Sequence, residues 1–370
     1  MDESLLNKLC DSLNSRGGSI PAYPVPEMFT LLEALFTEEE VEVACRMPPI
    51  ATSLEETADI LSRPAEDILP LLESMADKGL VATRKQDDVV LYKLLPIAPG
   101  IFEFQFMKGG KTDRDRELAR LLRGYVDVAG EYLKKDFSAL EDMTPFMRVI
   151  PVEKTIETGE RVYTFDQISR YIESADAIAV GHCYCHHEAY LLGKETCDAP
   201  EQRCINFGPG ALYTSERGIT RLISKEEALE IIEACAEKGL VHMGSNTSKY
   251  LEYLCNCCKC HCGTLQSLAR VGDPNLTASS GYIAEIEEGL CDGCGSCVEV
   301  CPVDAVSIDD REKAAVDQLS CIGCGLCARH CPADAIVMDP REDYSQPPDT
   351  PKELREAIMN DFVRSQERSL

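Results

Sequence analysis

The sequence lacks the patterns that mark a membrane-spanning or exported chain. It has no run of eighteen apolar residues, and its N-terminus has no basic stretch followed by an apolar one. A transmembrane helix needs about 20 predominantly apolar residues, and a secretory signal needs both of those N-terminal parts. We therefore expect no membrane insertion, no secretion and a cytoplasmic location.

Motifs for nucleotide cofactors are also missing. The chain contains no GxGxxG, no Walker-type GxxxxGK[ST] and no HExxH. The first two are glycine-rich loops that bind phosphates, and the third is a helix-borne zinc site of metalloproteases. No nucleotide cofactor is therefore indicated, and no catalytic residue can be named.

Basic residues are scarce, since 37 Lys and Arg stand against 64 Asp and Glu, for a formal net charge of −27. Such a chain repels nucleic acid and acidic membrane surfaces, but it attracts basic partner proteins. We expect no nucleic acid among its partners.

Cysteine is abundant, with 20 residues, most of them between positions 183 and 331. Disulfide scaffolds belong to small exported domains, so crowding in a chain of 370 residues indicates intracellular metal binding. Oxygen-sensitive metal clusters would place the protein in an anaerobic or low-oxygen setting. Three cysteines without cysteine neighbours are interpreted as structural thiols: Cys10, Cys45 and Cys235.

Residues 291–331 contain the pattern CxxCxxCxxxCP twice, which is typical of two 4Fe–4S clusters. Each run gives three thiolates to one cubane and its fourth cysteine to the other, whereas a zinc module would need CxxC pairs separated by a longer loop. The segment resembles bacterial two-cluster ferredoxin domains, which transfer electrons. The first cluster is expected on Cys291, Cys294, Cys297 and Cys331, and the second on Cys321, Cys324, Cys327 and Cys301.

Nine further thiols form a second concentration upstream. They are Cys183, Cys185, Cys197 and Cys204, followed by Cys255, Cys257, Cys258, Cys260 and Cys262. Adjacent cysteines suit a polythiolate metal site. Since a cubane takes four thiolates, nine thiols could hold one cubane with five thiols to spare, or two cubanes with one thiol to spare. Four alternatives stay open for this region: one further iron–sulfur cluster, two further clusters, zinc alone, or zinc together with an iron–sulfur cluster.

Side-chain alternation gives a first division of these thiols. In an extended backbone Cys255 and Cys257 would face one way, and Cys258, Cys260 and Cys262 the other. All six histidines lie in the same half of the chain, and a histidine can replace a thiolate as a cluster ligand. The alternative, which we expect for most of them, is a hydrogen bond to a sulfur or a peptide group. His186 and His187 directly follow Cys185, and we expect these two to be the exceptions that act as ligands.

The N-terminal region predicts a winged-helix-like arrangement. Helices are expected over residues 28–36, 53–61 and 64–78, and a β-hairpin over 80–83 and 89–94. From Glu27 to Lys108 there are seven Lys and Arg against sixteen Asp and Glu, which disfavours DNA binding and favours contact with protein.

Three further elements are expected downstream. Residues 111–135 form a helix with a basic face, which is solvated, paired with carboxylates of this chain, or a docking site for an acidic partner. Capping boxes at Thr164/Gln167 and Ser224/Glu227 predict helices to about Ser174 and Gly239. A buried strand is expected at residues 177–180.

Taken together, the motifs GHCYC, C-x6-C ending in Asn206-Phe207-Gly208, and CNCCKCHC resemble a poorly characterised family of anaerobe 4Fe–4S dicluster ferredoxin-domain proteins. In this chain His261 stands where that pattern has a further cysteine. The resemblance implies accessories of anaerobic electron transfer without a defined reaction.

We expect an α+β, multidomain protein. Its parts are an N-terminal segment (1–26), a winged-helix-like domain (27–110), a helical linker (111–143), a mixed α/β cysteine-rich iron–sulfur domain (144–270), a bacterial two-cluster ferredoxin domain (281–340) and a tail with a helix (341–370).

The expected function is relay of single electrons at low potential between redox partner proteins, as a component of an oxidoreductase system rather than an independent enzyme. One alternative is a reductase that uses an unusual middle-domain cluster on a small substrate, and the other is a redox-sensing winged-helix regulator. Homo-oligomerisation is left open.

Overall fold

The computed structural model describes residues 1–135, 143–156, 162–271, 277–342 and 344–368. The chain divides into two compact units. The first is built mainly from the N-terminal 135 residues, with His187–Glu195 and Pro209–Leu222 added, and the second contains the rest of the described residues. The end of the predicted linker (136–142) and residues 157–161 of the predicted cysteine-rich domain lie outside the described residues.

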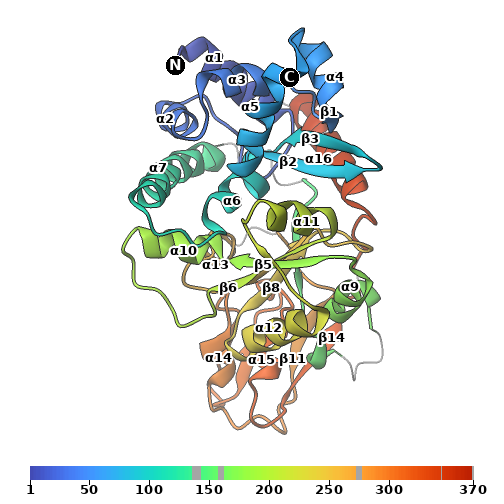
Figure 1. The fold of residues 1–370 in the computed structure, drawn as a ribbon. Helices are drawn as coiled ribbons and strands as arrows, with labels where there is room; N and C mark the ends of the chain where they lie inside the picture. Colours follow the sequence, from blue (N-terminus) through green and yellow to red (C-terminus); the bar gives the residue numbers. More distant parts are fainter. Residues whose placement is uncertain (136–142, 157–161, 272–276, 343, 369–370) are drawn as a thin grey trace. The chain divides into compact units, whose positions relative to one another are not determined.

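Helices dominate the first unit (Figure 1). They include α1 (Glu3–Asn14), α2 (Pro26–Leu35), α3 (Glu38–Ala44), α4 (Leu54–Leu61), α5 (Ala65–Asp77), α6 (Phe102–Phe106) and α7 (Asp113–Lys135). The predicted helices are present as α2, α4, α5 and α7, but α3 and α6 were missed. Helix α3 had a readable signal, since Thr37 and Glu40 form a capping box at its start.

A small antiparallel sheet completes this part of the first unit. Its strands are β1 (Thr52–Ser53), β2 (Val81–Gln86) and β3 (Val89–Leu94), in the order β1-β3-β2. The predicted hairpin is formed by β2 and β3, whose register runs from Val81 opposite Leu94 to Gln86 opposite Val89. A further short strand, β7 (Arg221–Leu222), lies in the Pro209–Leu222 segment of this unit.

The basic face of α7 binds groups of its own unit. Arg123 forms a bidentate ion pair with the buried Glu188, and Nε lies 3.0 Å from Oε1. Arg114 donates to the main-chain oxygen of Ala34 at 2.9 Å. These contacts favour pairing within the chain over a docking site for an acidic partner.

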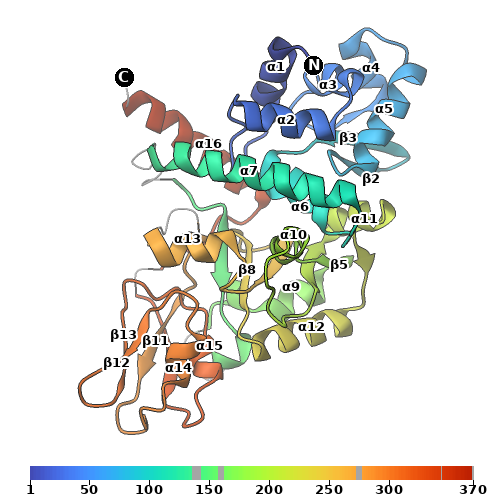
Figure 2. The ribbon, with the colours of Figure 1, turned by 90° about the vertical axis from the view of Figure 1, so that its left-hand side faces the viewer.

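The second unit is organised around a mostly antiparallel sheet (Figures 1 and 2). Its strands lie in the order β10-β4-β8-β9-β6-β5; β10 runs parallel to β4, and each following strand is antiparallel to the one before it. They are β4 (Met147–Ile150), β5 (Ile178–His182), β6 (Gln202–Phe207), β8 (Val241–Ser245), β9 (Tyr253–Cys257) and β10 (Thr277–Ala278). Every residue of β4 and β8 is buried, so these strands lie within the core.

Two helices of this unit bear on the predictions. Helix α12 (Lys225–Glu237) begins as expected, since the Ser224 side chain accepts from the Glu227 N–H. The expectation for α9 (Ile168–Ser174) was wrong at its start. Residues Thr164–Asp166 form a separate 3-10 turn, and Gln167 precedes the helix without a side-chain cap. The reason is the buried Asp166, whose carboxylate pairs with Arg148 inside the core.

The repeated cysteine segment has two similar halves. Its elements are β11 (Tyr282–Ile286), α14 (Ser296–Val300), β12 (Val306–Ile308), β13 (Ala314–Val316), α15 (Leu326–Arg329) and β14 (Ile336–Pro340). Strand β11 pairs with β14, and β12 pairs with β13, both antiparallel. Strands β12 and β14 follow Pro302 and Pro332, one in each half.

This segment packs into the rest of the second unit. The Val152 N–H donates to the main-chain oxygen of Cys324 at 3.0 Å, and Arg329 forms an ion pair with Glu233 of α12.

The remaining helices are α10 (Tyr184–Leu191), α11 (Gly208–Glu216), α13 (Gly263–Val271) and α16 (Pro351–Arg368). Across the described part of the chain, no helix combines the length and apolarity needed to cross a membrane.

Candidate metal centres

The repeated cysteine segment contains two small cavities. Each is lined by three cysteines of one run and the fourth cysteine of the other. The first has Cys291, Cys294, Cys297 and Cys331 in its wall, and the second has Cys301, Cys321, Cys324 and Cys327. This grouping is the crossed one that the spacing predicts, and ligation itself stays a prediction.

Backbone amides point at the sulfurs in both halves. The Ala305 N–H donates to the Cys301 Sγ at 3.2 Å, and the Ala335 N–H donates to the Cys331 Sγ at 3.3 Å. Both alanines follow an aspartate with positive φ, 56° at Asp304 and 48° at Asp334, which turns the amide toward the sulfur. Such hydrogen bonds stabilise the thiolate form that binds iron.

Two glycines allow the backbone to close around the cavities. A Cβ at Gly293 would lie 2.1 Å from the main-chain oxygen of Glu312, and one at Gly323 would lie 2.1 Å from that of Tyr282. Both residues also have positive φ, which L side chains rarely adopt. The positions therefore require glycine for reasons of space as well as conformation.

The two cavities differ in their exposure. Cys294 in the first wall is exposed, whereas Cys324 and Cys327 in the second wall are buried. Burial raises the pKa of the Cys327 thiol to about 12, and that of Cys324 well above its usual range. Free thiols here would stay protonated at neutral pH, so bound metal would have to displace their protons.

Comparison with known proteins agrees with this geometry. Residues 290–335 match the family model described as a 4Fe-4S dicluster domain. This segment is a ferredoxin-type domain. A protein described as a probable ferredoxin from Methanosarcina thermophila is 47% identical over 36 residues, which are 10% of this chain and 62% of that protein. The chain thus covers less than two thirds of that relative's length, and the match supports 4Fe–4S binding by this domain.

Upstream of the ferredoxin-type domain, six thiols form a closed ring of hydrogen-bonding neighbours, which we name the six-thiol ring. In order around it lie Cys183, Cys185, Cys262, Cys257, Cys255 and Cys204, and Cys204 returns to Cys183. Four of them are buried and two half-buried. Six soft ligands gathered in one ring fit a metal cluster.

Adjacent strand ends bring these thiols together. Cys183 follows β5 directly, Cys204 lies in β6, and Cys255 and Cys257 lie in β9. Strands β5, β6 and β9 are neighbours in the sheet, with Gly181 opposite Cys204. The ring therefore assembles from three segments that are far apart in the sequence.

Hydrogen bonds within the six-thiol ring shift its titration. The thiols of Cys204 and Cys257 lower the pKa of Cys255 to about 5. The pKa values of Cys183 and Cys262 are likewise held well below their usual range by donation from ring neighbours. The ring thus favours partial thiolate character, which soft metals require.

A fully buried arginine accompanies the ring. Arg203 is 0% exposed, and its guanidinium donates to the main-chain oxygens of Pro200 and Asn256 and to the Cys258 Sγ, the last at 3.6 Å. Although burial opposes its charge, the nearby thiolates of Cys183 and Cys204 raise the pKa of Arg203 above its usual range. A buried cation without a carboxylate partner among the described residues needs an anionic neighbour, which metal-bound thiolates would supply.

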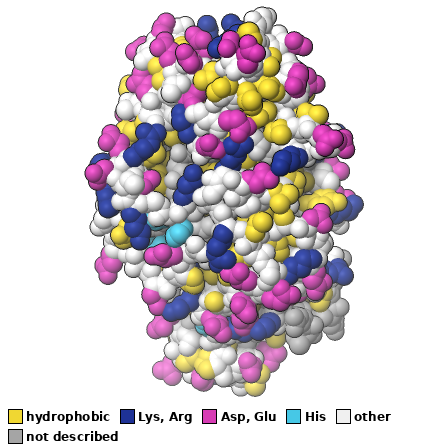
Figure 3. All heavy atoms as spheres, viewed as in Figure 1, with side chains coloured by type: hydrophobic (Ala, Val, Ile, Leu, Met, Phe, Trp, Pro, Cys, Tyr) yellow, Lys and Arg dark blue, Asp and Glu magenta, His cyan; other side chains and the backbone are white. Residues whose placement is uncertain are grey.

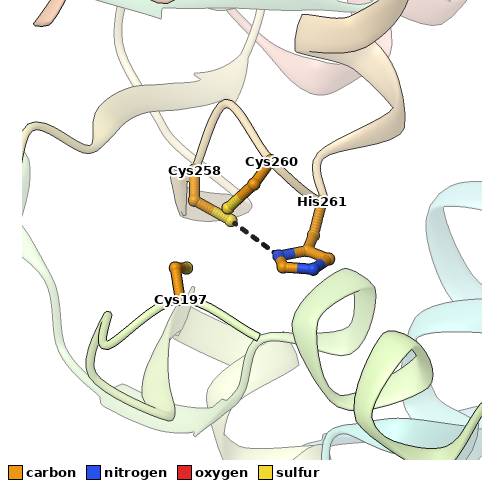
Figure 4. A group of neighbouring side chains, drawn as sticks. All are labelled: Cys197, Cys258, Cys260 and His261. Carbon is orange, nitrogen blue, oxygen red and sulfur yellow. Dashed lines mark hydrogen bonds between the residues drawn. The ribbon is translucent and has the colours of Figure 1, made fainter. Parts of the chain in front are cut away.

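The remaining three thiols lie beside a histidine (Figure 4). One ligand atom from each of Cys197, Cys258, Cys260 and His261 lies within 4.8 Å of the others. Cys258 Sγ and His261 Nδ1 are 3.8 Å apart. We name this the Cys3His group.

This grouping corrects the predicted alternation. Cys258 and Cys260 do face away from Cys255 and Cys257, but Cys262 joins the latter pair in the six-thiol ring. Strand β9 ends at Cys257, and the chain then turns, with the Cys262 N–H donating to the Cys258 oxygen at 3.1 Å. The period of two that applies to a strand therefore fails after Cys257.

The two histidines expected as exceptions follow the general expectation instead and bond to peptide oxygens. His186 Nε2 bonds to the main-chain oxygen of Cys197 at 3.1 Å, and His187 Nε2 bonds to that of Gly110 at 2.7 Å. His261 instead accompanies the thiols. Its position inside CNCCKCHC was the signal that could have identified it, whereas nothing local in the sequence marked Arg203.

The three isolated cysteines are placed in keeping with their structural interpretation. Cys10 and Cys235 are buried, and burial raises the pKa of each thiol to about 12. Cys45 is half-buried, and burial raises its pKa as well. None of the three belongs to the six-thiol ring or the Cys3His group.

Proposed function

We propose that the protein is an iron–sulfur electron-transfer component in which two cubanes of the ferredoxin-type domain exchange single electrons with a third iron–sulfur cluster held by the six-thiol ring. The chemistry of the bound clusters is one-electron transfer between iron atoms. The protein residues hold the clusters, exclude water and set the local charge.

The observation that carries this proposal is the shared core of the two cysteine-rich parts. Cys257 and Cys262 of the six-thiol ring belong to the same buried cluster as Cys297, Cys301 and Cys324 of the ferredoxin-type domain. Electrons pass readily between clusters only over short distances through packed protein. Contact within one core supports an intramolecular path.

The exposure difference suggests the direction of this path. The cavity with the exposed Cys294 is the natural point for exchange with a partner protein, and the second cavity, whose Cys301, Cys324 and Cys327 are buried, would pass electrons inward. The Lys259 Nζ donates to the main-chain oxygen of Cys301, a residue that lines the second cavity. Lys259 lies between Cys258 and Cys260 of the Cys3His group. The relay would therefore run from the surface through both cubanes to the six-thiol ring.

Charge supports low reduction potentials and a basic partner. Acidic side chains are spread over the face shown in Figure 3, and the chain has a net charge of −27. Negative charge disfavours the reduced, more negative cluster, and it steers basic surfaces toward the protein. Arg203 opposes this effect locally at the six-thiol ring. We expect midpoint potentials well below zero for the two cubanes.

We also propose that α3, α4, α5 and the β1-β3-β2 sheet form a winged-helix arrangement that contacts protein rather than DNA. In a DNA reader α5 would be the recognition helix, but its Glu73 and Asp77 both accept from Arg217 at 2.8 Å. The hydrogen bond from Arg217 lowers the pKa of Glu73, and two carboxylates against one guanidinium leave this part of α5 with a net negative charge. Such a surface repels phosphates.

Metal analysis of the full chain, purified without oxygen, tests the central proposal. Two cubanes contribute about 8 irons per chain, and a third cluster of the same kind would raise the count to about 12. Iron and sulfide are quantified together, and each centre is followed by electron paramagnetic resonance during a redox titration. About 8 irons with only ferredoxin-type signals would refute a cluster in the six-thiol ring.

A variant pair assigns the additional iron. A cubane takes four thiolates and the ring offers six, so C183A/C204A/C255A, which leaves three ring thiols, should bring the iron count back to about 8 while the ferredoxin-type signals remain. The matched control is C235A, which removes a buried thiol of α12 outside the ring and should leave the count unchanged. Equal loss in both variants would point to general destabilisation instead.

A further inference from the structure

We infer that Cys197, Cys258, Cys260 and His261 bind one zinc ion in a tetrahedral site separate from the iron–sulfur clusters. Their ligand atoms all lie within 4.8 Å of one another. In a zinc tetrahedron with Zn–S near 2.3 Å and Zn–N near 2.0–2.1 Å, neighbouring ligand atoms are about 3.6–3.8 Å apart. The sulfur–nitrogen spacing is the shorter of these, about 3.6 Å, and the 3.8 Å between Cys258 Sγ and His261 Nδ1 is close to it.

The same spacing disfavours a cubane at this position. A 4Fe–4S cluster binds each cysteine through a different iron atom, so its sulfurs lie much further apart than those around one ion. Three thiolates and one imidazole are instead a common ligand set of structural zinc sites. Cys197 and His261 are half-buried and Cys260 is exposed, which places this group near the surface.

Arg203 is the second, independent observation. Three thiolates, a neutral histidine and Zn²⁺ carry a net charge of −1, and the fully buried guanidinium donates to one of those sulfurs, Cys258 Sγ, at 3.6 Å. Metal-bound thiolate therefore supplies the counter-charge that no carboxylate of the described residues provides. The buried arginine therefore offsets negative charge on the zinc–thiolate centre, which it contacts directly at Cys258, as well as on the neighbouring six-thiol ring.

The surroundings also orient the ligands. His186 bonds through Nε2 to the main-chain oxygen of Cys197 at 3.1 Å, and its ring meets that of His261 edge-on, with centroids 5.4 Å apart. Groups that hold a ligand's backbone and ring in place are typical neighbours of metal sites. His186 is thus a positioning residue for this site.

The zinc ion would fix the turn that follows β9. It joins Cys197, which lies before β6, to the turn at Cys258–His261, and Lys259 in that turn bonds to the ferredoxin-type domain at Asp304. Zinc does not change its redox state, so it would stabilise the interface without carrying electrons.

Element-specific X-ray absorption at the zinc edge tests the inference on the full chain as isolated. We expect about one zinc per chain with three sulfur neighbours near 2.3 Å and one nitrogen near 2.0–2.1 Å. Iron does not contribute at this edge, so the result does not depend on whether the six-thiol ring holds a cluster. A chain free of zinc, or zinc bound only by oxygen and nitrogen, would overturn the proposal.

Three variants complete the test. C260A and H261A should each lose most of the zinc at unchanged iron and sulfide, whereas H261C should retain it with four sulfur neighbours. C45A, at a half-buried thiol of the first unit outside both thiol groups, is the control and should keep the full amount. Loss of iron instead of zinc in C260A would show that these thiols bind a cluster.

Discussion

Lys259 Nζ donates to the main-chain oxygen of Cys301 at 3.1 Å and to Asp304 Oδ1 at 2.6 Å. The lysine lies between Cys258 and Cys260, and Cys301 lines the second cavity of the ferredoxin-type domain. This contact joins the loop of the Cys3His group to the backbone beside a cubane. It is a direct polar link between the two cysteine-rich parts.

We predict that K259M slows electron exchange between the ferredoxin-type clusters and the middle centre several-fold. The pair is solvent-accessible, so its loss should cost at most about 1 kcal/mol of stability and leave iron content unchanged. Freeze-quenched paramagnetic resonance after rapid reduction measures the exchange. The control is K238M, which removes another accessible pair of the same unit, Lys238–Asp198 at 2.6 Å, and should not alter the rate.

Pairs of cysteine variants test the crossed assignment of the ferredoxin-type clusters. Cys291 and Cys331 line the same cavity, so C291A/C331A should lose one cubane, about 4 irons per chain. Cys321 lines the other cavity, and C321A/C331A should lose both, about 8 irons. An equal loss in the two double variants would contradict the crossed arrangement.

Gly323 should tolerate no side chain. In G323A the new Cβ would meet Tyr282 O at 2.1 Å and Ser280 Oγ at 2.3 Å, and the positive φ adds strain. We expect destabilisation by roughly 3 kcal/mol and loss of the second cluster, seen as lower iron content and a lower unfolding midpoint. G289A is the control, since nothing lies within 4 Å of its Cβ position; a wild-type iron content in G323A would refute the steric argument.

His242 makes stability sensitive to mild acid. It is buried in β8, where Nδ1 pairs with Asn256 Oδ1 at 2.6 Å and Nε2 has no partner among the described residues. Burial lowers its pKa to about 4. Because the unfolded chain takes up a proton near pH 6.5 and the folded chain does not, stability should fall by about 1 kcal/mol between pH 6.5 and 5.5.

The variant H242Q cannot titrate and should lose that part of the pH dependence. Thermal unfolding at about pH 7.5 and about pH 5.5, on either side of the ordinary histidine pKa, gives the comparison when followed by far-ultraviolet circular dichroism without oxygen. H330Q serves as the control, since His330 is partly exposed and bonds to the Ala236 oxygen at 3.1 Å. If wild type and H242Q lose equal stability on acidification, His242 is not the sensor.

Prediction succeeded where the signals were local. Helix α12 followed from Ser224 and Glu227, and the hairpin predicted over residues 80–83 and 89–94 is formed by β2 and β3. It failed at α9, because a buried ion pair between Arg148 and Asp166 decided the local structure. A capping box competes poorly with a charge pair that must be satisfied in the core.

The two ferredoxin-type clusters could be predicted from sequence alone, because all eight expected ligands fall within 41 residues at spacings that only a cluster requires. The sorting of the nine upstream thiols depended on tertiary structure. Strand pairing brings Cys183, Cys204 and Cys255 together, and the turn after β9 sends Cys262 back to them, while Cys258 and Cys260 meet Cys197 and His261. Ligands that converge from distant segments are grouped by the fold, since spacing along the chain carries no information about which of them meet.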